Sequence, residues 1–146
     1  MKVVVQRVLE ASVSVSGKQV SAIKQGYLLY VGFTHDDTLE EVSYIARKVA
    51  NLRIFSDSEG KMNLSLAQTN GEILSISQFT LYGDTRKSNR PSFTQAMDYQ
   101  KADMLYQSFN QMLESEYGIN VHGGVFGDHM QIASINDGPV TIIIEK

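Results

Sequence analysis

The chain contains many short runs of strand-forming residues but only two segments with the apolar spacing of an amphipathic helix. The first helix is expected from Thr38, which forms a capping-box pattern with Glu41, and the second from about Asp98 to Gly118. Strands are expected at 1–9, 12–15, 19–23, 27–33, 52–55, 72–80, 120–126, 129–135 and 140–145. Because strands and helices do not alternate as βαβ units, the pattern predicts an α+β fold, with a mostly antiparallel sheet or partly closed β-barrel flanked by two main helices.

Length and composition restrict the class of protein. The 146 residues suit a single domain, 1–146, and the absence of cysteine excludes disulfides, thiolate nucleophiles and cysteine metal sites. The three histidines lack metal-binding spacing, so neither a metal nor another cofactor is expected. No leader or membrane-spanning run is visible, which indicates a cytoplasmic protein without a membrane partner. A formal net charge of −3 argues against a protein that coats DNA.

A polar cluster, Ser77-Gln78-Phe79-Thr80, ends the strand predicted at 72–80. Strand ends that open into loops often hold reactive groups. Ser77 and Thr80 are nucleophiles by type, but no lysine or histidine lies nearby in sequence to act as the base. The alternative is that both hydroxyl groups satisfy backbone groups where the strand ends.

The segment 84–92 concentrates three cations, Arg86, Lys87 and Arg90, in a predicted loop. Positive charge combined with hydroxyl and amide donors suits contact with phosphate groups. Such a loop could bind a few nucleotides but not a long duplex; otherwise it is a solvated loop with scattered charge.

Arg7 falls on the apolar face of the first predicted strand, together with Val3, Val5 and Leu9. A buried guanidinium needs acceptors, which backbone carbonyls or a carboxylate would supply. Alternatively, the side chain extends to water at the edge of the sheet.

Two glycine-containing segments near the C-terminus are also unusual. Residues 123–127 place three glycines around Phe126, which suits a bulge or bend, or a shelf on which a base stacks. His129, close by, is expected to be a surface histidine. The segment INDGPVT (135–141) is expected to be a turn between two strands, although a simple reversal needs no proline.

Taken together, these segments resemble the D-aminoacyl-tRNA deacylase family. The similarity runs from MKVVVQRVLEASVSV at the start, through THDDT, NLRIF and EGKMNLS, to the end of the chain. SQFTL (77–81) and NDGPVT (136–141) match the two signature motifs of that family, and TRKSNRPSF between them also fits.

The resemblance implies a homodimer that hydrolyses the ester between a D-amino acid and the 3′-terminal adenosine of tRNA. It implies a cis Gly138-Pro139 bond that enters the partner's active site and excludes L-amino acids. Glycine, which has no side chain, would be rejected only in part. Arg7 would hold this motif in place. A related editing domain is attached to archaeal threonyl-tRNA synthetases; because no synthetase is attached here, a free-standing enzyme is expected.

The resemblance also suggests roles within the pocket. The amides of Phe79 and Thr80 would stabilise the oxyanion, beside Ser77, while Gln78 and the Thr80 side chain position the substrate and the adenosine 2′-OH assists the water. Phe126 and Met130 would line the adenosine pocket, and the basic loop would contact tRNA. Two other functions stay open: an RNA-end-binding module without catalysis, and a general esterase or peptidase for small D-configured molecules.

Overall fold

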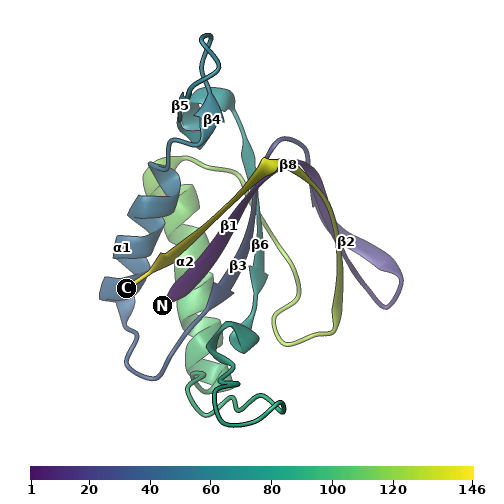
Figure 1. Cartoon of the computed structure of the whole chain (residues 1–146), viewed down its shortest axis with the longest axis vertical. Coiled ribbons are helices and arrows are strands. Elements are labelled where there is room, and N and C mark those ends of the chain that lie inside the picture. The colour runs from purple at the N-terminus through teal and green to yellow at the C-terminus, as the bar shows by residue number, and fades with distance from the viewer.

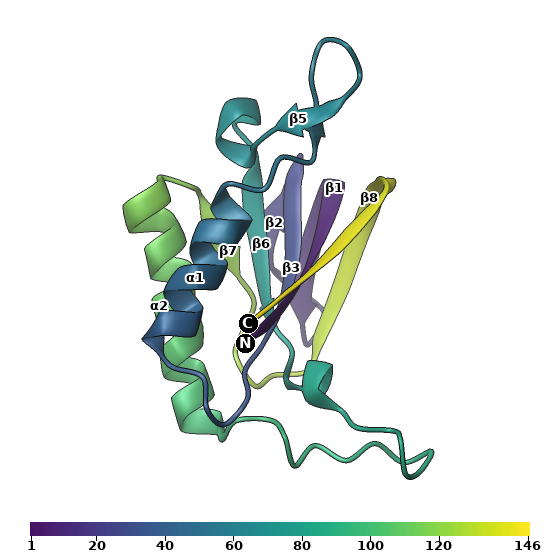
Figure 2. The ribbon, with the colours of Figure 1, turned by 60° about the vertical axis from the view of Figure 1, so that its left-hand side comes forward.

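The computed structural model describes all residues from 1 to 146, and its main sheet has the strand order β2-β1-β3-β6-β7, with β8 also paired to β1 (Figure 1). Two helices cover one face of this sheet, and a small hairpin, β4–β5, projects from one end (Figure 2). The strands are β1 (Lys2–Val15), β2 (Lys18–Ile23), β3 (Gly26–Gly32), β4 (Phe55–Ser56), β5 (Met62–Leu64), β6 (Glu72–Ser77), β7 (Val121–Gly123) and β8 (Met130–Glu145). The helices are α1 (Leu39–Ala50) and α2 (Tyr99–Tyr117), with short 3₁₀ helices η1 (Leu66–Thr69) and η2 (Phe79–Tyr82). The predicted α+β class is confirmed.

Both predicted helices are present, and local interactions define their ends. The Thr38 hydroxyl accepts a hydrogen bond from the Glu40 amide, and the Glu41 carboxylate accepts one from the Thr38 amide. Helix α2 begins after Asp98, whose side chain accepts a bond from the Lys101 amide, and ends at a left-handed Gly118. These caps satisfy amides that a helix leaves without partners.

The expectation that strand–helix–strand units are absent is wrong. Strand β3 pairs in parallel with β6, and β6 pairs in parallel with β7. Parallel neighbours require a crossover connection, and α1 and α2 lie in the two crossovers. Since the first crossover also contains the β4–β5 hairpin and η1, the alternation is hidden in the sequence. The strand predicted at 52–55 is largely loop and contributes only Phe55 to that hairpin.

The segment INDGPVT does not reverse the chain. Strand β8 continues through it, and residues on both sides pair antiparallel with β1. The register shifts between Gln6 and Val8 and again between Val8 and Glu10, so the segment forms an irregularity within one long strand pair. The shift moves Leu9 to the exposed face, which corrects the expectation that it shares a face with Val3, Val5 and Arg7.

The sheet buries apolar residues on both faces. One face packs against the two helices in a cluster of 21 buried residues, and a second cluster of seven includes Leu28, Leu74 and Val13. The apolar run of β3 is buried on both sides, as predicted. In this structure no helix combines the length and the apolar character needed to cross a membrane.

Candidate functional site

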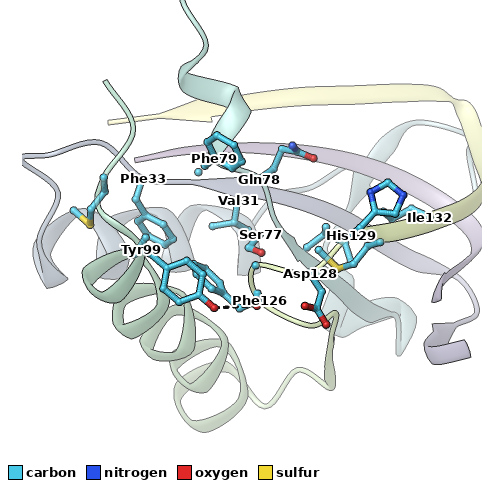
Figure 3. A pocket seen from close by; sticks show the side chains of 16 residues that line it. Val31, Phe33, Ser77, Gln78, Phe79, Tyr99, Phe126, Asp128, His129 and Ile132 are labelled. Atoms are coloured by element: carbon cyan, nitrogen blue, oxygen red, sulfur yellow. Dashed lines mark hydrogen bonds between the residues drawn. The ribbon is translucent and has the colours of Figure 1, made fainter. Parts of the chain in front are cut away.

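A cavity of about 500 Å³ lies where the parallel strands β3 and β6 end. Carboxyl ends of neighbouring parallel strands are frequent ligand sites, because the chain leaves the sheet there. Figure 3 shows side chains from β3, β6, η2, α2 and the segment before β8 turned toward this space. The lining residues are Val31, Gly32, Phe33, Ile76, Ser77, Gln78, Phe79, Met97, Tyr99, Ala102, Phe126, Gly127, Asp128, His129, Met130 and Ile132.

The polar cluster predicted from the sequence forms one edge of this cavity. Strand β6 ends at Ser77, three residues earlier than expected, and the Gln78 amide donates to the Val31 carbonyl at 2.7 Å. The chain then enters η2, in which each amide bonds to the carbonyl three residues before it. The amides of Phe79 and Thr80, at the start of η2, therefore have no acceptor within this helix.

The side chains at this edge do not form a pair of nucleophile and general base. The Gln78 side-chain amide donates to the Thr80 hydroxyl, and Thr80 itself does not line the cavity. Ser77 lines it, but no hydrogen bond joins its hydroxyl to a histidine, lysine or carboxylate. This edge of the cavity thus shows no activated side-chain nucleophile.

Aromatic residues form the opposite wall. Phe126 packs edge-on against Tyr99, with ring centroids 5.1 Å apart, and the Tyr99 hydroxyl donates to the Phe126 carbonyl at 3.3 Å. Met130 closes in beside them, so tightly that a Cβ on Gly124 would lie 2.4 Å from its sulfur. The predicted pair Phe126 and Met130 therefore lines the cavity that Ser77 and Gln78 also line.

Three of the lining residues with polar side chains, Tyr99, Asp128 and His129, were not assigned to the site by the sequence analysis, which expected His129 only as a surface residue. Tyr99 is the first residue of α2, and Asp128 and His129 lie in the turn before β8, with the histidine exposed at the rim (Figure 3). The glycines of residues 123–127 indicated a bend, but nothing local indicated that it faces the end of β6. No group of three or more histidine, aspartate or glutamate side chains is placed to hold a metal ion.

Arg7 and Gly138-Pro139 lie away from this cavity. Arg7 is 9% exposed; it donates to the Ile54 carbonyl at 2.5 Å and pairs with the Asp137 carboxylate at 2.9 Å. The Gly138-Pro139 peptide bond is cis, and both residues are exposed. Val3, four residues from Arg7 along β1, pairs with Val31 of the cavity, which corresponds to about 13 Å. A chain therefore does not bring its own Gly138 to its own cavity.

The three cations of the predicted loop are exposed and none lines the cavity. Arg86 is held by both oxygens of Asp84, and its guanidinium lowers the pKa of that carboxyl to about 2. Lys87 and Arg90 form no ion pair. The net positive charge of the loop therefore comes from Lys87 and Arg90.

Comparison with known proteins identifies the family. The model of the family described as D-Tyr-tRNA(Tyr) deacylase matches residues 4–145. The chain belongs to this family. It is 55% identical over 146 residues to a D-aminoacyl-tRNA deacylase of Exiguobacterium sibiricum and 53% identical to one of another Exiguobacterium species, in both cases over 100% of this chain and at least 99% of the relative. The resemblance drawn from the sequence motifs is confirmed, and the chain is a hydrolase.

Two solved structures share the fold of this chain. A protein named c-Myc DNA unwinding element binding protein superposes with a TM-score of 0.95 at 43% identity, covering 100% of this chain and 99% of the other. A probable eukaryotic D-amino acid tRNA deacylase shares the fold, with a TM-score of 0.84 at 19% identity over 98% of this chain and 97% of the other.

Proposed function

We propose that the protein hydrolyses the ester bond between a D-amino acid and the 3′-terminal adenosine of tRNA in the cytoplasm. The observation that supports this proposal is that the aromatic wall lines the same cavity as Phe79, the first residue of η2, whose amide has no acceptor within that helix. A nucleoside needs the first feature, and a reacting ester carbonyl needs the second.

In the proposed reaction the adenosine lies against Phe126 and Met130, and its 3′ ester extends toward η2. Water attacks the ester carbonyl, and the amides of Phe79 and Thr80 stabilise the resulting oxyanion; one such donor typically lowers the barrier by about 2.7–4 kcal/mol. The tetrahedral intermediate then releases the free amino acid and the 3′-hydroxyl of tRNA. Gln78, hydrogen-bonded to Thr80, positions the substrate, and the adenosine 2′-OH orients the water.

We infer that a second copy of the chain supplies the chiral filter. Gly138 and Pro139 are exposed and lie on the order of 13 Å or more from their own cavity, so they would act on the cavity of a partner in a homodimer. Carbonyl oxygens placed beside the α-carbon would leave no room for an L side chain while accepting a D side chain. Glycine, which has no side chain, would be rejected only weakly.

The activity is tested with matched tRNA esters. D-tyrosyl-tRNA incubated with the protein is expected to lose its ester many-fold faster than L-tyrosyl-tRNA, with release of free amino acid followed over time. Equal stability of both esters would leave only an RNA-end-binding module. Comparable turnover of a D-tyrosine methyl ester would instead favour a general esterase, because that molecule lacks the adenosine that the aromatic wall would bind.

The shared site predicts that the active species is a dimer. An interface that places Gly138-Pro139 in the partner's cavity should bury at least the ordinary ~1,200–2,000 Å². Sedimentation velocity at the concentration of the activity assay is expected to show a particle of twice the chain mass. A fully active and D-selective monomer would exclude the chiral filter proposed here.

A further inference from the structure

An exposed aromatic pair lies between the cavity and the basic loop. Phe79, which lines the cavity, is 58% exposed, and Phe93 beside it is 39% exposed. Their ring centroids are 5.1 Å apart, with the ring planes at 65°. Figure 3 shows Phe79, the first residue of η2, at the border of the cavity close to Gln78. Two large apolar rings are thus left open to water at the mouth of the proposed adenosine site.

The position of Phe93 is determined by the hydrogen bonds that close the basic loop, residues 84–92. Asp84 and Ser92 exchange two backbone hydrogen bonds, at 2.8 and 2.9 Å, which close the loop directly before Phe93. Gly83 lies so close that a Cβ there would be 3.1 Å from the Phe93 ring. Phe93 is therefore held in place by the backbone on one side, while more than a third of its side chain stays exposed.

The cations of the basic loop, which continues from the aromatic pair, suit contact with the phosphates of a nucleic acid. Lys87 and Arg90 lie within the loop that Asp84 and Ser92 close, and neither forms an ion pair. A surface that binds single-stranded nucleic acid combines such cations with exposed rings, because every base has a face that can stack on an aromatic side chain. The 3′ end of tRNA is single-stranded, so its bases are free to stack.

We propose that Phe93, supported by Phe79, stacks on the base of the nucleotide that precedes the terminal adenosine. Lys87 and Arg90 then contact the phosphates on the 5′ side of that nucleotide. This inference rests on the proposed function. It assigns a second nucleotide site, outside the cavity, that positions the acceptor end without touching the reacting atoms.

The test compares three D-tyrosyl esters that extend the nucleic acid step by step: D-tyrosyl-adenosine, D-tyrosyl-CpCpA and D-tyrosyl-tRNA. For Phe93→Ala, kcat/KM on the trinucleotide and on tRNA is expected to fall by about 5- to 150-fold, the range that a base–aromatic stack supplies. The loss should lie mainly in KM. Turnover of the adenosine ester, which has no preceding base, should stay within about twofold of the wild type.

Two further variants separate stacking from structural support. Phe93→Tyr keeps the ring and should retain near wild-type kcat/KM on all three esters. Lys87→Ala should weaken the trinucleotide and tRNA reactions, leave the adenosine ester unchanged, and reduce the dependence of the tRNA reaction on salt, because it removes a phosphate contact that the adenosine ester lacks. If Phe93→Ala slowed the adenosine ester as much as the other two, Phe93 would merely hold η2 in place, and the proposal would be wrong.

Failure of this inference differs from failure of the proposed function. If the wild-type protein hydrolyses the three D-esters but Phe93→Ala changes none of them, only the second nucleotide site is excluded. If the wild-type protein hydrolyses none of them, the deacylase function itself is excluded.

Discussion

Replacing Gly32 by alanine is expected to lower kcat/KM on D-aminoacyl-tRNA by about 10- to 100-fold while the protein stays folded. A Cβ at this position would lie 2.9 Å from the Gln78 carbonyl oxygen and 3.1 Å from the Leu81 Cβ. Because one contact is backbone, the link from β6 into η2 must move, and it carries the proposed oxyanion amides. Displacement of a catalytic group by about 1 Å can cost about 100-fold in rate.

The matched control for this variant is Gly123→Ala. Gly123 ends a strand close to the same cavity, but a Cβ there would meet only the Tyr106 hydroxyl at 3.6 Å, an ordinary contact. Steady-state hydrolysis of D-tyrosyl-tRNA and circular dichroism should be measured for both proteins. A Gly32→Ala enzyme with wild-type turnover would show that the position of η2 does not govern the reaction.

Arg7→Ala is expected to lower the free energy of unfolding by about 2–4 kcal/mol and to weaken discrimination against L-amino acids. The change removes a donor to the buried Ile54 carbonyl and a partner of Asp137. The loss should be smaller than for a fully buried ion pair, because the Asp137 side chain is 38% exposed. Since Asp137 precedes Gly138 directly, the segment that forms the proposed chiral filter would lose its anchor.

Urea unfolding and the ratio of D- to L-tyrosyl-tRNA hydrolysis measure the two effects. Arg53→Ala is the matched control, because Arg53 also donates to a backbone carbonyl, that of Asn63, but on the surface. Its effect on stability should stay below about 1 kcal/mol. An Arg7→Ala protein that keeps both the urea midpoint and the D/L ratio of the wild type would contradict the anchoring role.

The candidate site could be predicted only in part, because its residues come from distant segments. The motif at 77–80 marks one edge of the cavity, and Phe126 and Met130 mark the opposite wall. Tyr99 carries no such signal, since an aromatic residue at the start of a helix usually serves packing. The alternatives for Arg7 could be separated only by its surroundings, which supply the Ile54 carbonyl and the Asp137 carboxylate.

The sequence alone determined the two helices, the α+β class and the family. Helices depend on contacts three and four residues apart and on caps such as Thr38 and Asp98, all of which are local. Only the tertiary structure decided that β3, β6 and β7 run in parallel and that β8 continues through Gly138-Pro139. Strand pairing is formed by hydrogen bonds between segments far apart in the chain, and these pairings place β3 beside β6 and so create the cavity.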